Sequence, residues 1–132
     1  EKLELQENVK FLGVLNETDM AHNIKNKHVY VMSSIIENSP NTLGEAMMLG
    51  VPCVASYNGG VSQMANDEIE ALLYRANDSK MLAYQIKRIF ESNELMKRLT
   101  SNAYKKASIT HDPSKNYQDL ISCYQNILRD EI

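Results

Sequence analysis

The segment from Ser33 to Gly60 constrains the fold of this chain more than any other part. Its polar loop lies between two apolar runs, 28–32 and 51–56, and a helix-like stretch follows the loop. Strands that are apolar throughout and alternate with helices are typical of parallel sheets covered on both faces. Ligands of such sheets bind beyond the carboxyl ends of the strands, where we expect this polar loop to lie.

The rest of the sequence continues this alternation. Asn16 is predicted to cap the first helix, and Gly50 to end the second. We therefore expect an α/β fold, a Rossmann-like three-layer parallel sheet of about four strands with helices on both faces and further helices at the C-terminal end. The predicted strands are 9–13, 28–32, 51–56 and 71–74, and the predicted helices are 17–26, 42–50, 61–66, 79–91, 93–109 and 113 onward.

The length of 132 residues suits a single domain, 1–132, rather than two. Because the sequence begins with Glu1 and not Met, we expect it to be part of a longer protein. No apolar run approaches the length of a membrane span, and no secretory signal pattern opens the sequence. The two cysteines, Cys53 and Cys123, lack metal-ligand spacing, and Cys53 is expected to be a small buried residue. These features favour the cytoplasm.

The net charge of -3 comes from an acidic first half, since residues 1–74 hold more than twice as many Asp and Glu as Lys and Arg. Neither half is basic enough to indicate nucleic-acid binding. An anionic ligand bound to the first half would therefore need backbone N–H groups, or cations from outside this chain.

Two carboxylates stand out within the opening segment. Glu37 lies in the polar loop and belongs to no amphipathic face. It is either a solvated loop residue or an acceptor for two adjacent ligand hydroxyls, as a sugar offers. Glu45 lies near the start of the next helix, where it could form a capping box with Thr42 or bind a ribose diol.

Backbone groups in the same segment suit an anion. The N–H groups of Thr42, Leu43 and Gly44 are expected to point out of the helix start, toward any phosphate placed there. Gly59 and Gly60 allow a ligand to approach closely, although a glycine pair often forms only a turn. No phosphate-binding loop, dinucleotide fingerprint or nucleophile motif is present.

These residues together resemble a known family. The ordered set Glu37-x7-Glu45-Ala46-Met47, Gly50-Val51-Pro52-Cys53-Val54-Ala55-Ser56 and Gly59-Gly60 is similar to the donor-binding domain of retaining glycosyltransferases of the GT-B fold, family 4 or group 1. The resemblance extends from about residue 5 to residue 90. The sequence from Glu37 to Glu45 also resembles the corresponding segment of enzymes that assemble bacterial surface polysaccharides.

The resemblance implies a role for each matching position. Glu37 is the expected catalytic-site residue, binding hydroxyls of the donor sugar near the reacting carbon, and Glu45 is expected to bind the nucleotide ribose. The mechanism implied is sugar transfer from a nucleotide diphosphate with retained configuration, without a metal or other cofactor. The remaining expected donor-binding residues are Asn41, Thr42, Leu43 and Gly44 at the diphosphate and sugar, Gly59 and Gly60 nearby, and Gly13, Val14 and Leu15 beside the nucleobase.

The chain departs from the family pattern in two ways. Gln63 stands where the family often has an acidic residue. The upstream Arg and Lys that neutralise the diphosphate, and the whole acceptor domain, are missing. We therefore expect an enzyme whose isolated fragment is inactive and whose partners are a nucleotide sugar and an N-terminal acceptor domain. The full-length enzyme is expected in the cytoplasm, with peripheral association at the inner face of the membrane.

Two alternatives remain open at the level of sequence. A sugar-nucleotide epimerase of the GT-B fold uses the same crevice, and product analysis without acceptor distinguishes it. A non-catalytic Rossmann-like binding module is the second alternative, to which Gln63 gives slight support. Binding of UDP-, GDP- or ADP-sugars by the full-length protein distinguishes that alternative from an enzyme.

Overall fold

The structure, a computed structural model, describes residues 4–130. Residues 1–3 and 131–132 of the predicted single domain lie outside this part. The elements are the 3-10 helix η1 (Gln6–Asn8), α1 (Glu17–Lys25), β1 (Tyr30–Met32), α2 (Asn41–Met48), β2 (Cys53–Tyr57), α3 (Val61–Met64), β3 (Leu72–Arg75), α4 (Ser79–Glu91), α5 (Asn93–Thr110) and α6 (Pro113–Asp130).

The three strands form one parallel sheet in the order β1-β2-β3. Tyr30 lies beside Cys53 in the first pair, and Val54 lies beside Leu72 in the second. Parallel neighbours need a crossover, which α2 supplies between β1 and β2 and α3 between β2 and β3. The predicted parallel α/β sheet is therefore confirmed.

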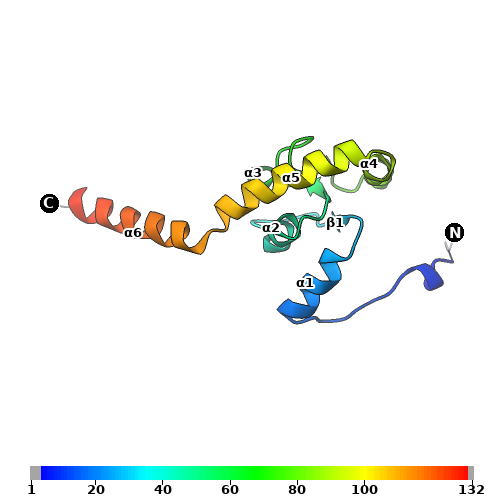
Figure 1. The fold of residues 1–132 in the computed structure, drawn as a ribbon, viewed down its shortest axis with the longest axis horizontal. Coiled ribbons are helices and arrows are strands. Elements are labelled where there is room, and N and C mark those ends of the chain that lie inside the picture. The colour runs from blue at the N-terminus through cyan, green and yellow to red at the C-terminus, as the bar shows by residue number, and fades with distance from the viewer. Residues whose placement is uncertain (1–3, 131–132) are drawn as a thin grey trace.

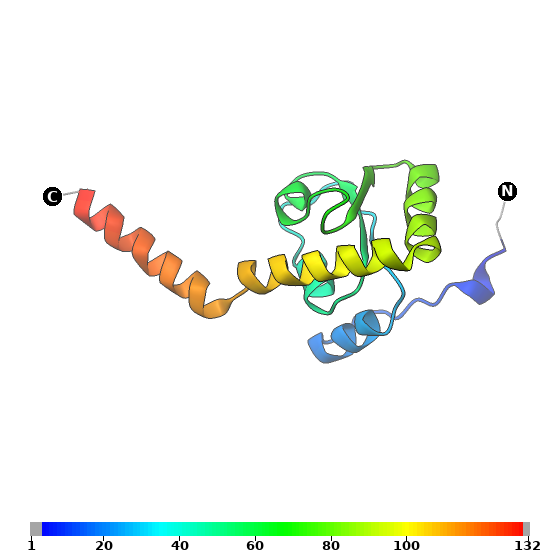
Figure 2. The same cartoon turned by 45° about the horizontal axis from the view of Figure 1, so that its top comes forward.

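Both faces of the sheet are covered by helices, as the sequence predicts (Figures 1 and 2). Cys53 and Ala55 of β2 face a buried cluster that includes side chains of α2, α3 and the second half of α5. Val54, between them, faces the opposite cluster with Ile89 of α4 and Leu99 of α5. Successive side chains of a strand point to opposite faces, and here both directions are apolar.

The predicted strand at 9–13 is wrong, so the sheet has three strands among the described residues rather than four. This segment runs away from the body of the domain (Figure 1), and Phe11 is 93% exposed. Valine and phenylalanine favour a strand only where a neighbouring strand takes up the backbone hydrogen bonds and a surface takes up the side chains. Residues 4–130 contain no such neighbour for this segment.

The predicted ends of the first two helices are confirmed. The side chain of Asn16 accepts a hydrogen bond from the Asp19 N–H at 2.8 Å, as a helix cap does. Gly50 follows α2 with a φ of 71°, and the Val51 N–H donates to the Ala46 carbonyl at 3.1 Å. A left-handed residue with this bond pattern is the glycine stop that the sequence predicts.

The last helix, α6, forms as predicted but projects from the rest of the molecule (Figure 2). Its apolar face is exposed throughout, namely Tyr117, Leu120, Ile121, Tyr124, Ile127 and Leu128. Within the described residues, no helix combines the length and apolar character needed to cross a membrane.

The two cysteines have opposite environments, and neither forms a disulfide. Cys53 is fully buried in β2, which confirms the prediction, whereas Cys123 is exposed on α6. Burial raises the pKa of the Cys53 thiol to about 12. The thiolate is the reactive form of cysteine, and the raised pKa disfavours it at Cys53. Burial also shields the Cys53 sulfur from reagents.

This contrast predicts selective alkylation of the native chain. With iodoacetamide at about pH 8, Cys123 should react on the order of 100 times faster than Cys53, because Cys53 must first be exposed by unfolding. Peptide mass spectrometry after timed labelling measures both rates. In denaturant the two rates should converge, and equal rates in the native chain would contradict the buried position of Cys53.

Candidate functional site

The polar loop after β1 lies against the turn after β2. The Gly60 N–H donates to the Glu37 carbonyl at 3.3 Å, and the Glu37 side chain is half-buried. A Cβ at Gly59 would lie 1.7 Å from the Glu37 carbonyl oxygen, and one at Gly60 would lie 1.7 Å from that of Asn38. No side chain fits at such distances, so the two glycines are required by the approach of the loop itself. This contact fixes the position of the Glu37 carbonyl group.

The start of α2 differs from the predicted capping box. Pro40 occupies the cap position, without a side-chain cap, and the helix begins at Asn41. Thr42 therefore lies inside the first turn, and its hydroxyl accepts a hydrogen bond from the Tyr30 hydroxyl at 2.9 Å. The capping box is wrong because a capping side chain must belong to the residue before the helix. Glu45 is thus left without the structural role that the sequence offered for it.

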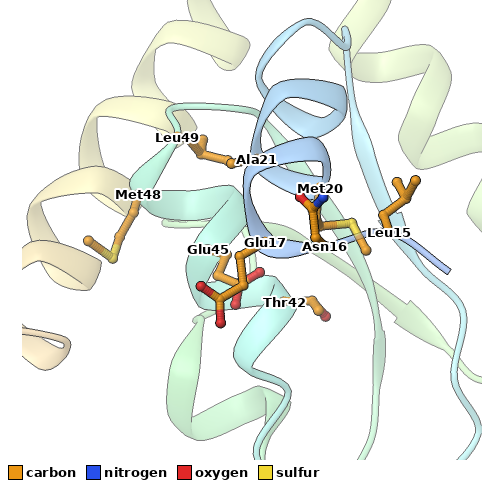
Figure 3. Close-up of a pocket in the computed structure, with 9 residues that line it drawn as sticks. All are labelled: Leu15, Asn16, Glu17, Met20, Ala21, Thr42, Glu45, Met48 and Leu49. Atoms are coloured by element: carbon orange, nitrogen blue, oxygen red, sulfur yellow. The ribbon is translucent and has the colours of Figure 1, made fainter.

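A groove with a volume of about 520 Å³ lies between α1 and α2 (Figure 3). It brings together three of the predicted site residues, Leu15, Thr42 and Glu45. The exposed Glu45 side chain projects into the space between the two helices. The other residues that line the groove are Asn16, Glu17, Met20, Ala21, Met48 and Leu49.

The groove is lined mainly by apolar side chains and by two carboxylates. Its aliphatic and thioether side chains offer a surface for a flat ring. Glu17 of α1 and Glu45 of α2 both project into it, and none of the nine lining residues in Figure 3 is basic. Two carboxylates repel a phosphate, so the groove suits the uncharged part of a ligand that donates hydrogen bonds.

Tyr30 connects this groove to the loop that carries Glu37. Burial raises the pKa of the Tyr30 hydroxyl above its ordinary value, the hydrogen bond to Thr42 opposes this rise, and the negative charges of Glu45 and Glu37 add to it. The Tyr30 hydroxyl is protonated at neutral pH even at its ordinary pKa, and it donates a hydrogen bond to Thr42.

The remaining predicted residues lie around these features rather than in the groove. Asn41 is exposed at the first position of α2, and Leu43 is buried in the core, with its N–H donating to the Pro40 carbonyl at 2.9 Å. Gly13 and Val14, just before the groove residue Leu15, are exposed.

Gly44 is buried where α2 meets the end of α5. A Cβ at this position would lie 2.5 Å from Nε2 of His111 and 3.2 Å from the terminal carbon of Met64. The missing side chain of Gly44 thus allows two helices to approach, a role that the sequence does not indicate.

Sequence reasoning missed the contribution of α1 to the site. Glu17 looks like a charge at a helix start, and Met20 like a core residue, so neither stands out locally. Tyr30 looks like an ordinary strand residue. Their shared position depends on the packing of α1 against α2, for which the linear pattern holds no signal.

No group of three or more His, Cys, Asp or Glu side chains able to hold a metal ion occurs within residues 4–130. A second groove of about 520 Å³ lies where α4 meets α5, lined by residues that include Arg88, Glu94 and Arg98. The Arg88 guanidinium is already paired with the Glu68 carboxylate, which lowers the pKa of Glu68.

A parallel sheet covered on both faces, with a groove beside the first helix that follows β1, defines a Rossmann-like α/β domain. Residues 1–106 match the family described as Glycosyl transferases group 1. The chain belongs to this family, and the solved structures similar to it are glycosyltransferases of the GT-B fold. No curated protein sequence matches the chain.

Three solved structures illustrate the likeness. HepE from Anabaena in complex with UDP is 25% identical, with a TM-score of 0.87 over 92% of this chain and 33% of HepE. The same protein in complex with UDP-glucose has a TM-score of 0.86, with the same identity and coverage. Sucrose-phosphate synthase from Thermosynechococcus elongatus is 24% identical, with a TM-score of 0.87 over 96% of this chain and 32% of the synthase, which shows the fold. The chain spans about a third of the length of these structures.

The contact at Gly44 predicts the sign of a substitution. In an open helix position, Gly→Ala stabilises by up to about 1 kcal/mol. Here Gly44→Ala should lower the free energy of unfolding by about 1–3 kcal/mol, because the new methyl group collides with His111. Urea denaturation of the variant and of Gly44→Ala/His111→Ala measures the effect.

The double variant serves as the matched control. Removing the His111 ring makes room for the methyl group, so the cost of Gly44→Ala should be smaller in the His111→Ala background than alone. A stabilising Gly44→Ala, or the same cost in both backgrounds, would contradict the contact.

Proposed function

We propose that this chain is the donor-binding part of a retaining glycosyltransferase, which binds a nucleotide-diphosphate sugar for transfer to a glycan or lipid-linked acceptor. The observation that carries the proposal is the groove between α1 and α2, which gathers Leu15, Thr42 and Glu45 in a chain of the group 1 family. HepE, which shares the fold at 25% identity, binds UDP and UDP-glucose.

The nucleoside occupies the groove in this proposal. Its base lies against the apolar wall that starts at Leu15, and the Glu45 carboxylate accepts hydrogen bonds from the two ribose hydroxyls. The combined negative charge of Glu17 and Glu45 keeps phosphate groups out of the groove. The nucleotide is thereby oriented, with its diphosphate leaving the groove at the start of α2.

The diphosphate and the sugar then lie near the loop after β1. The N–H groups of Asn41 and Thr42 and the turn at Gly59 and Gly60 border this region, and Glu37 binds hydroxyls of the donor sugar beside the reacting carbon. The Leu43 N–H takes no part, because it donates to the Pro40 carbonyl. The bond from the anomeric carbon to the diphosphate oxygen breaks, and the acceptor hydroxyl oxygen forms a bond to that carbon with the same configuration. The proton of the acceptor hydroxyl passes to the leaving diphosphate. The charge that develops on the leaving diphosphate is stabilised electrostatically, without a metal ion.

Cations for the diphosphate come from outside this chain, because the first half of the sequence is acidic. An N-terminal acceptor domain of the same protein supplies the acceptor site, so the isolated chain is inactive. We place the full-length enzyme in the cytoplasm, associated peripherally with the inner face of the membrane, in the assembly of a surface polysaccharide.

The role of Glu37 is tested by Glu37→Gln in the full-length enzyme. Transfer should fall by about 100-fold or more in kcat, because a neutral amide cannot stabilise the sugar as charge develops in the transition state. Affinity for UDP, measured by calorimetry, should stay within about twofold of the parent enzyme, since Glu37 does not line the groove. Near-normal turnover would contradict the assignment.

The role of Glu45 is tested by comparing UDP with 2′-deoxy-UDP. A carboxylate that binds the ribose diol should give the parent enzyme a preference for UDP on the order of 10-fold or more. In Glu45→Gln this preference should largely disappear. The matched control is Glu91→Gln, an exposed glutamate on α4 paired with Lys87, which should leave the preference unchanged. An unchanged preference in Glu45→Gln would exclude Glu45 from the ribose site.

A further inference from the structure

Two side chains, one from β2 and one from the turn that follows it, bind the carbonyl oxygen of Ser34. It accepts hydrogen bonds from the Ser56 hydroxyl at 2.5 Å and from the Asn58 side-chain amide at 2.6 Å. The same Asn58 nitrogen also donates to the Ser56 hydroxyl oxygen at 2.8 Å. Ser56 is 0% exposed, whereas Ser34 and Asn58 are half-buried. The three hydrogen bonds join the end of β2 to the loop after β1.

The orientation of the Asn58 amide is determined by its partners. A backbone carbonyl only accepts hydrogen bonds, so the amide must present its nitrogen to Ser34. Its oxygen, Oδ1, is then buried without a hydrogen-bond partner among the described residues. Burying an acceptor in this way is costly, because the group loses its bond to water and gains nothing in exchange.

A second contact lies next to these three hydrogen bonds in the sequence. Gly59 and Gly60, which follow Asn58 in the same turn, pack against the backbone of Glu37 and Asn38. The loop therefore has two attachment points, the Ser34 carbonyl and the Glu37 carbonyl. These two contacts restrict the backbone that carries the Glu37 side chain. Ser56 and Asn58 line none of the grooves described above.

We propose that Ser56 and Asn58 are positioning residues that set the place of the Glu37 carboxylate relative to the donor sugar. This inference rests on the proposed function, because it assigns these two residues to the same reaction. They touch no substrate and act through the Ser34 carbonyl. A misplacement of a reacting group by about 1 Å can cost on the order of 100-fold in rate, so the effect is large enough to measure.

The experiment uses Asn58→Asp and Ser56→Ala in the full-length enzyme. Asp has the shape of Asn but lacks both N–H donors, whereas Ala removes only the serine hydroxyl. Each variant should lower kcat on the order of 10–100-fold while the KM for the donor and the affinity for UDP stay within about twofold. The matched control is Asn102→Asp, because the Asn102 amide also donates to a loop carbonyl, that of Ile69, away from the site. It should leave kcat unchanged.

A second background separates positioning from a structural role. In Glu37→Gln, the further loss of kcat caused by Asn58→Asp or Ser56→Ala should shrink to about twofold or less, since both variants act through the carboxylate that has been removed. If Asn58→Asp does not fold, Ser56→Ala in both backgrounds decides the question. Equal losses in the two backgrounds, or unchanged kcat in the foldable variants, would overturn the inference.

The same measurements distinguish failure of this inference from failure of the proposed function. If Glu37→Gln alone leaves transfer intact, the proposed role of Glu37 fails, and the positioning role fails with it. If Glu37→Gln lowers kcat but the losses from Asn58→Asp or Ser56→Ala are independent of it, only the positioning role is wrong.

Discussion

The candidate site depends on one backbone contact, the approach of the loop after β1 to the turn after β2. Parallel strands place their carboxyl ends at the same edge of the sheet, so these two connections meet there. They can meet only because Gly59 and Gly60 lack side chains at points where the Glu37 and Asn38 carbonyls come within van der Waals distance of the backbone. The loop then leads through Pro40 into α2, which presents Thr42 and Glu45 to the groove.

Electrostatics divides the site into two regions. The groove holds Glu17 and Glu45 and an apolar wall, and it suits the hydroxyl groups and the ring of a nucleoside. The first two residues of α2, Asn41 and Thr42, stand at a helix start, where backbone N–H groups favour an anion. Tyr30 connects the two regions, because its hydroxyl bonds to Thr42 and lies within range of both the Glu37 and Glu45 charges.

Much of the fold could be predicted from the sequence because the determining signals are local. The helix α4 begins at Ser79 and ends at Glu91, as its apolar spacing predicts. Asn16 caps the start of α1, and Gly50 adopts the left-handed conformation after α2, as their residue types predict. The strand expected at 9–13 did not form because a strand needs a neighbour as well as suitable residues. The capping box at Thr42 failed because Pro40 already occupies the cap position.

The candidate site was only partly predictable, for a related reason. Leu15, Thr42 and Glu45, three of the residues that the family resemblance names, line one groove. Glu17 and Tyr30, however, join the site through contacts between segments far apart in the sequence, such as the hydrogen bond from Tyr30 to Thr42. Gly44 was predicted as a ligand-binding residue, but its small size is explained by its contact with His111, the residue after α5. No local pattern in the sequence connects His111 with α2.

The most direct test of the account is hydrogen–deuterium exchange of the full-length protein with and without saturating UDP. Binding of the nucleoside between α1 and α2 predicts slower amide exchange in peptides that cover residues 14–21 and 42–49, with little change in peptides that cover residues 88–98 at the second groove. Protection confined to residues 88–98, or no protection anywhere at saturation, would contradict the placement of the nucleotide.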